Sequence, residues 1–211
     1  MSPRPYQLGA RQVQIDDSRQ KVIDAARALL IESTSYTTFT VDAVAKRADV
    51  ARATIYYQFE SKIGLIEAVC DALAEDGQMA ELASAFTNPD PIEAFSIFIA
   101  CFARFWNSDR LVMRRLRSLA RLEQEVGGVI SARDGRRSSG LAVLVARFSD
   151  QHLLNVEPDR ALQILFTLTS FETFDSLAAD NLSMTDVEGE ILAMAEAIWK
   201  DPKKTQLTDT R

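Results

Sequence analysis

The stretch ARATIYYQFESK, residues 51–62, places three aromatic side chains among polar and basic ones. The aromatic side chains of Tyr56, Tyr57 and Phe59 would be unfavourable on an ordinary surface helix. The charges of Arg52 and Lys62 would be unfavourable in a core helix. The combination suits a helix that packs one face inward and turns the other toward a charged polymer.

The residues before this stretch predict a first helix. Apolar side chains from Val22 to Leu30 recur at helical spacing, with a cap expected at residues 16–18 and an end in the polar cluster 33–38. The segment before residue 15 is predicted to be frayed.

Two further helices and a turn are predicted around the quoted stretch. Thr40 is a natural N-cap for a helix whose apolar residues recur at i, i+3, i+4 and i+7. A turn at Asp49 and Val50 then leads into the stretch, and a cap at residues 60–61 starts a fourth helix.

The rest of the chain is also predicted to be helical. After the break TNPDP (87–91), helical patterns cover approximately residues 92–107, 109–125, 128–150, 158–180 and 185–200, and no strand alternation persists. The fold class is therefore all-α, with a frayed tail from residue 201.

Two short helices joined by a tight turn predict a helix-turn-helix, whose second helix enters the DNA major groove. The packing residues are Val44, Ala45, Val50, Ile55 and Phe59, and the outward residues are Arg52, Ala53, Thr54, Tyr57 and Gln58. Tyr56 and Lys62 lie where a hydroxyl and an ammonium could bind the flanking phosphates.

Residues 19–73 resemble the TetR family of bacterial transcriptional regulators, through VIDAARALL (22–30), YTTFTVDAVAKRADV (36–50) and ARATIYYQFESKIGLIEAV (51–69). The resemblance implies that Thr40, Tyr56 and Lys62 bind phosphate and that Arg52, Ala53, Thr54, Tyr57 and Gln58 form the base-reading face. It also implies an all-α homodimer whose C-terminal domain binds a small molecule and releases a double-stranded DNA operator.

The sequence departs from the family pattern at the turn. Asp49 stands where Gly is frequent, and Asp tolerates a left-handed conformation better than most residues. Ala51 stands where a capping Ser is usual, at a cost of about 1 kcal/mol of local helix stability. We expect a DNA-binding domain over residues 1–62 and a ligand-binding and dimerisation domain over residues 63–211.

Aromatic residues of the second domain are either plain core or the lining of a ligand site, and the residues alone favour core. With the family resemblance, the predicted ligand contacts are Phe98, Phe102, Trp106, Met113, Arg117, Phe166, Ser170 and Phe174. Their aromatic and hydroxyl groups suit an apolar or amphipathic ligand. The basic helix face Arg110, Arg114, Arg117 and Arg121 is expected to be solvated and paired with acidic neighbours, or to supply one Arg to a ligand carboxylate.

The last two helical patterns are predicted to form a dimer interface, a four-helix bundle across a two-fold axis. Their apolar sets are Leu162, Leu165, Leu168 and Phe171 in the first and Ile191, Leu192, Ala195 and Trp199 in the second.

Charge and motif content exclude other classes. The net charge is −6, but residues 1–62 carry nine basic and seven acidic side chains, so the acidity lies in the remainder. Cys70 and Cys101 are expected to be buried thiols of a cytoplasmic protein, and no apolar run suits a membrane span. His152 is the only histidine, and no nucleotide or nucleophile motif occurs, so no metal, cofactor or enzymatic activity is predicted.

Two hypotheses follow from the sequence. The first is a repressor that a ligand releases from a palindromic operator. The alternative is a helical small-molecule binding or interaction protein that no longer reads DNA.

Overall fold

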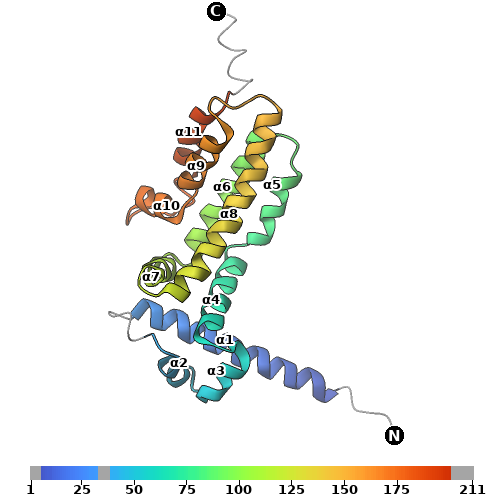
Figure 1. The fold of residues 1–211 in the computed structure, drawn as a ribbon. Coiled ribbons are helices and arrows are strands. Elements are labelled where there is room, and N and C mark those ends of the chain that lie inside the picture. Colours follow the sequence, from blue (N-terminus) through green and yellow to red (C-terminus); the bar gives the residue numbers. More distant parts are fainter. Residues whose placement is uncertain (1–5, 33–38, 201–211) are drawn as a thin grey trace, which may run out of the picture. The chain divides into compact units, whose positions relative to one another are not determined.

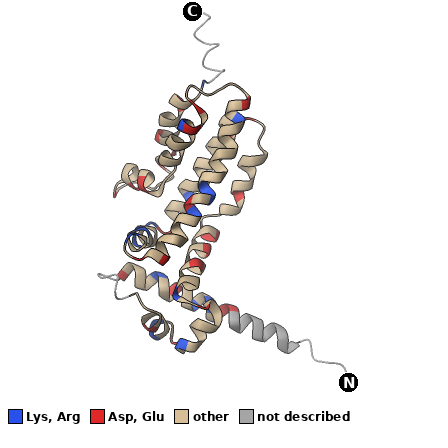
Figure 2. Ribbon diagram, in the orientation of Figure 1, with Lys and Arg blue, Asp and Glu red and all other residues tan. Residues whose placement is uncertain are grey.

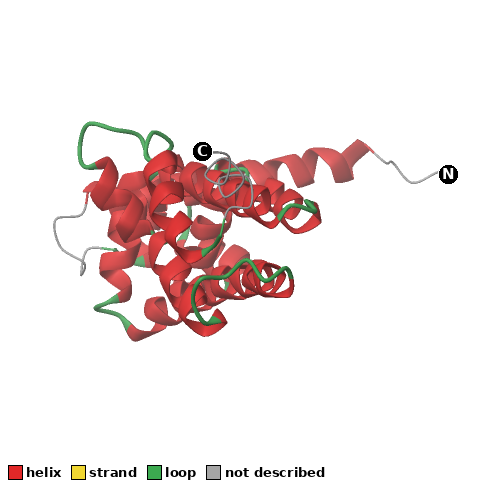
Figure 3. Ribbon diagram, turned by 90° about the horizontal axis from the view of Figure 1, so that it is seen from above, coloured by secondary structure: helices red, strands yellow, loops and turns green. Residues whose placement is uncertain are grey.

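The structure is a computed structural model that describes residues 6–32 and 39–200, with side chains from residue 16 onward. Within these residues the chain forms eleven α-helices, and Figure 3 shows only helices and loops, so the all-α prediction is confirmed. The described helices include none that is long and apolar enough to cross a membrane.

The chain divides into two compact units. The N-terminal unit contains residues 1–72 and 114–130, and the C-terminal unit contains residues 73–113 and 131–211. The functional boundary predicted after residue 62 stays a prediction.

The N-terminal unit is built on α1 (Tyr6–Glu32), α2 (Val41–Ala48), α3 (Arg52–Phe59) and the first turns of α4 (Lys62–Asp76), labelled in Figure 1. Val22, Val44, Ile55 and Leu65 are fully buried and form its core. Burial of each such side chain contributes about 1.5–3 kcal/mol, which holds the short helices α2 and α3 in place.

The first helix begins earlier than predicted. Residues 16–18 lie inside α1 and do not cap it, and the prediction of a frayed segment is wrong for residues 6–14. The run YQLGARQVQ lacks proline and is rich in helix formers, so the helix extends back to Tyr6. Predictions for residues 1–5, 33–38 and 201–211 lie outside the described residues.

The C-terminal unit contains the following helices. They are η2 (Met79–Leu82), α5 (Ala83–Thr87), α6 (Pro91–Ser108), α9 (Pro158–Leu168), α10 (Phe171–Ala178), α11 (Glu188–Ala195) and η3 (Glu196–Ile198). The helices α7 (Arg110–Ala120) and α8 (Gln124–Asp150) supply residues to both units. Helix α6 starts as a capped helix should, because the Asp90 carboxylate accepts from the backbone N–H of Ile92 at 2.9 Å.

The predicted helix over residues 158–180 is two helices. The Thr169 hydroxyl donates to the carbonyl of Leu165 at 2.8 Å, and extended backbone at Ser170 ends α9. The Ser170 hydroxyl then accepts from the Thr173 backbone N–H and caps α10.

The prediction of the dimer interface is wrong for most of its residues. Leu165, Phe171, Ile191, Ala195 and Trp199 are buried within the protomer. Trp199, for example, packs edge-on against Phe95 with ring centroids 5.3 Å apart. These side chains therefore build the core of the C-terminal unit.

Candidate nucleic-acid interface

The turn between α2 and α3 is fixed by local backbone chemistry. The Thr40 hydroxyl accepts from the backbone N–H of Ala43 at 3.1 Å, so the predicted N-cap is confirmed. Asp49 adopts the left-handed conformation (φ 54°, ψ 48°), and its N–H donates to the Ala45 carbonyl. Ala51 precedes α3 without a side-chain cap, also as predicted.

Helix α3 has a buried and an exposed face, as predicted for most of its residues. Ile55 and Phe59 are buried, at 0% and 4% exposure. Tyr57 is 82% exposed, and Arg52 and Tyr56 are also exposed. The outward face of α3 thus offers an aromatic and a cationic side chain to a partner. Ala53 is exposed beside them and Thr54 is half-buried.

Arg52 is held by its neighbours on the outward face. Its Nη1 lies 3.1 Å from a carboxylate oxygen of Asp42, and its Nη2 donates to the Tyr56 hydroxyl at 3.1 Å. The hydrogen bond with Tyr56, and next the charge of Asp42, raise the pKa of Arg52. Arg52, which is predicted to contact bases, and Tyr56, which is predicted to bind phosphate, are therefore hydrogen-bonded to each other.

Gln58 differs from the prediction that it faces outward. Its side-chain amide donates to the hydroxyl of Ser18 in α1 at 3.3 Å, and its backbone carbonyl accepts from Arg19 at 3.0 Å. The Arg19 guanidinium also lies 4.4 Å from the centroid of the Phe59 ring. Residues of α1 fix the end of α3, which no local pattern around residue 58 indicates.

Lys62 opens α4 and is bound on two sides. Its ammonium donates to both carboxylate oxygens of Glu123, at 2.7 and 3.0 Å, and lies 5.6 Å from the centroid of the Phe39 ring. Helix α4 approaches α3 closely, because a Cβ at Gly64 would lie 2.0 Å from the carbonyl oxygen of Phe59. Glu123 was not singled out from the sequence, since 61 residues separate it from Lys62.

Comparison with known proteins identifies this arrangement. Residues 22–69, which include α2 and α3, match the family model of bacterial regulatory proteins of the tetR family. These residues form a TetR-family domain. No curated protein matches the sequence.

Solved structures extend the likeness over most of the chain. A TetR transcription regulator from Haloarcula marismortui is 15% identical, with a TM-score of 0.67 over 88% of this chain and 100% of its own. A protein from Saccharomonospora viridis in complex with choline is 14% identical, with the same TM-score and coverage. SmeT, the repressor of a Stenotrophomonas maltophilia multidrug efflux pump, is 17% identical, with a TM-score of 0.63 over 87% of this chain and 91% of its own. The chain thus has the fold of TetR-family transcriptional regulators.

Helix α6 follows the TetR-family domain and carries three of the predicted ligand contacts. Phe98, Phe102 and Trp106 are buried, with ring centroids 4.7 Å and 5.6 Å apart along the helix. Phe174 of α10 is also fully buried, and Met113 of α7 is 5% exposed. These side chains belong to the packed core of the C-terminal unit.

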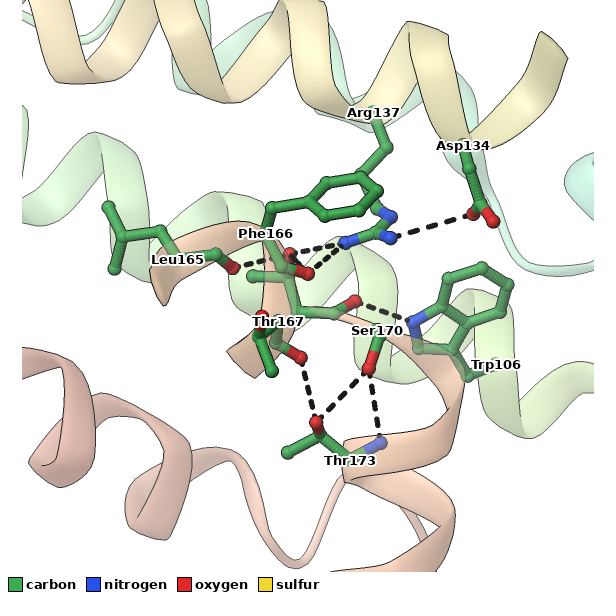
Figure 4. Close-up of polar contacts among 9 residues, drawn as sticks. Trp106, Asp134, Arg137, Leu165, Phe166, Thr167, Ser170 and Thr173 are labelled. Carbon is green, nitrogen blue, oxygen red and sulfur yellow. Dashed lines mark hydrogen bonds and ion pairs between the residues drawn. The ribbon is translucent and has the colours of Figure 1, made fainter. Parts of the chain in front are cut away.

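The junction of α9 and α10 contains an arginine that the sequence analysis did not select (Figure 4). Arg137 of α8 is 4% exposed and donates to the carbonyl of Phe166 at 2.6 Å and the hydroxyl of Thr169 at 2.8 Å. Its guanidinium lies 3.9 Å from the centroid of the Phe166 ring, and Asp134 lies 3.5 Å away. Among the basic residues of α8, neither helical period nor composition distinguishes Arg137.

Two of the predicted ligand contacts, Trp106 and Ser170, have structural partners at the same junction. Trp106 donates from its indole N–H to the Thr169 carbonyl at 3.1 Å, and Ser170 caps α10. Arg117 is half-buried and belongs to the N-terminal unit, unlike the other predicted ligand contacts.

The basic residues of α7 are blue in the ribbon of Figure 2. Arg110 pairs with Asp175 of α10 at 2.5 Å, so pairing with an acidic neighbour is confirmed for this residue. Within the described residues no group of three or more His, Cys, Asp or Glu side chains could hold a metal ion.

Proposed function

We propose that the chain is a DNA-binding transcriptional regulator, a cytoplasmic repressor that binds a palindromic operator as a homodimer. The observation that carries the proposal is the outward face of α3, where Arg52, Tyr56 and Tyr57 are exposed on a helix fixed by buried Ile55 and Phe59. One recognition helix contacts only a few base pairs, so useful specificity requires two half-sites and therefore a dimer.

The proposed roles follow from the chemistry of each side chain. Thr40 uses its oxygen to accept the cap bond, which leaves its hydroxyl proton available for a phosphate. Tyr56 and Lys62 would also bind phosphates. Arg52, with a forked guanidinium at the start of α3, would bind the O6 and N7 acceptors of guanine.

The other members of the proposed base-reading face make smaller contributions. Ala53 and the methyl group of Thr54 suit apolar contact with a thymine methyl, and Tyr57 offers a large exposed ring. Gln58 would join this face only after its amide leaves Ser18.

The dimer would use exposed apolar side chains of the C-terminal unit. Leu177, Leu182 and Met194 are 37%, 49% and 42% exposed, and they lie in or beside α10 and α11. They replace the buried residues of the interface predicted from the sequence. Sedimentation of the purified protein as a monomer at micromolar concentration would contradict this part of the proposal.

A small apolar or amphipathic ligand is proposed to release the DNA. Its contacts would be the α6 aromatics Phe98, Phe102 and Trp106 with Phe166, Ser170, Phe174 and Met113, which would have to part from the packed core of the C-terminal unit to admit it. A coupling of about 1–3 kcal/mol would give a 5–150-fold change in DNA affinity. The choline complex of the Saccharomonospora viridis protein supports a small-molecule site in this fold, and SmeT supports repression.

A second candidate is a small-molecule binding protein without DNA recognition. The ion pairs of Arg52 with Asp42 and of Lys62 with Glu123 favour it, because both proposed DNA contacts already have carboxylate partners. The net charge of −6 also favours this second candidate, because it disfavours approach to the DNA phosphates. Neither candidate includes catalysis.

A retardation assay with the DNA upstream of the chain's own gene distinguishes the two candidates. The repressor proposal expects tighter binding to that DNA than to a random duplex. Arg52→Ala should cost about 1–3 kcal/mol on the specific DNA and less on the random duplex. Arg160→Ala, which removes an exposed arginine of α9, is the matched control and should change neither affinity. No preference by the wild-type protein would favour the second candidate.

A further inference from the structure

The ion pair of Lys62 and Glu123 is more enclosed than an ordinary surface pair. The two side chains are 29% and 35% exposed, and both carboxylate oxygens accept from the ammonium. The Phe39 ring, itself buried, covers the ammonium from another side at 5.6 Å. An enclosed pair of this kind is screened by salt less than an exposed one.

The position of Lys62 in its helix is electrostatically unfavourable. It is the first residue of α4, where the helix dipole leaves a partial positive charge that disfavours a cation. The dipole of the same helix end favours an anion. The Glu123 carboxylate therefore compensates the ammonium beside this helix end, as a bound phosphate would.

We propose that Glu123 is an internal competitor of the DNA phosphate for Lys62, so that the turn between α7 and α8 sets the DNA affinity of the N-terminal unit. This inference rests on the proposed function. A phosphate near Lys62 meets a cation whose charge is already compensated, and it is repelled by the carboxylate. Full binding requires Glu123 to withdraw.

Backbone hydrogen bonds join the turn that carries Glu123 to both helices. Its backbone N–H donates to the Leu119 carbonyl at 2.9 Å, and its own carbonyl accepts from Gly127 at 2.9 Å. A Cβ at Gly127 would lie 2.8 Å from the Ala120 carbonyl oxygen, so the two helix ends are in close contact there. The backbone of Glu123 therefore moves together with α7 and α8, and both helices continue into the C-terminal unit. Displacement of either helix would then change the affinity for DNA.

The test compares Glu123→Gln with Glu125→Gln in DNA binding at fixed salt. Glu125 is exposed in the first turn of α8 and has no ion pair within the described part of the chain, so its variant removes the same charge without the contact. Both variants are tested on a random duplex and on the upstream DNA. Glu123→Gln should bind each DNA about two- to fivefold more tightly than Glu125→Gln does, because a partly exposed ion pair typically has that strength. In a Lys62→Ala background this difference should disappear.

Two results would overturn the inference. One is equal DNA affinity of Glu123→Gln and Glu125→Gln, and the other is a gain that persists in the Lys62→Ala background. If Glu123→Gln does not fold, Glu123→Asp keeps the charge and withdraws it by one methylene, and its affinity must then exceed that of wild type. If the wild-type protein binds no DNA, the proposed function is overturned as well. If the wild-type protein binds DNA and the two variants have equal DNA affinity, this inference alone is overturned.

Discussion

Replacing Arg137 by Met should destabilise the C-terminal unit strongly. The substitution keeps an apolar stem of similar length but removes the hydrogen bonds to the Phe166 carbonyl and the Thr169 hydroxyl. Hydrogen bonds to charged groups contribute about 1.5–3 kcal/mol each, so their loss gives about 3–6 kcal/mol. The Asp134 carboxylate, which is partly exposed, regains some hydration and reduces the cost. We therefore expect the free energy of unfolding to fall by about 3–5 kcal/mol.

Urea denaturation followed by tryptophan fluorescence measures this effect directly. Trp106 and Trp199 are the only tryptophans, and both belong to the C-terminal unit. Because an oligomer's stability depends on concentration, all variants are compared at one protein concentration. Arg136→Met is the matched control, since Arg136 is exposed on the same turn of α8, and it should change stability by less than about 0.5 kcal/mol. An Arg137→Met protein as stable as wild type would refute the role assigned to this network.

Two further variants test other contacts. Gly64→Ala should destabilise the N-terminal unit by at least about 2 kcal/mol in a thermal melt, because its Cβ would lie 2.0 Å from the Phe59 carbonyl oxygen. The control Gly128→Ala in α8, where a Cβ meets open space, should stabilise by about 0.5–1 kcal/mol. Burial raises the pKa of the Glu188 carboxyl against the attraction of Arg104, so the folded state holds that proton more tightly. It therefore loses stability as the pH rises from the ordinary Glu range through the raised pKa. Glu188→Gln should therefore be more stable than wild type at neutral pH and equal to it at acidic pH, while the exposed Glu190→Gln should show no such gain.

Much of the N-terminal unit could be predicted from the sequence because local interactions decide it. The Thr40 cap spans three residues, and the left-handed Asp49 depends on its own backbone conformation and the preceding turn. The burial of Ile55 and Phe59 follows from their spacing on one helix face. A reader of the sequence alone can recover these features, and with them the TetR-family domain.

The start of α1 and the break at Ser170 both follow from local rules. Nothing in the run from Tyr6 forbids a helix, and the hydroxyls of Ser170 and Thr173 are typical of a new helix start. Both features were therefore available in the sequence, but continuous helical periodicity concealed the second.

The sequence by itself determined the helix-turn-helix, the Thr40 cap and the burial of Ile55 and Phe59, because each depends on residues within one or two helical turns. The tertiary structure alone decided three other features. It set Glu123 against Lys62, enclosed Arg137 at the α9–α10 junction, and buried Trp199 and its neighbours inside the protomer. Helical spacing marks a face as apolar but does not say whether the chain itself or a partner covers it. Contacts between residues tens of positions apart depend on how whole helices pack, which no short pattern records.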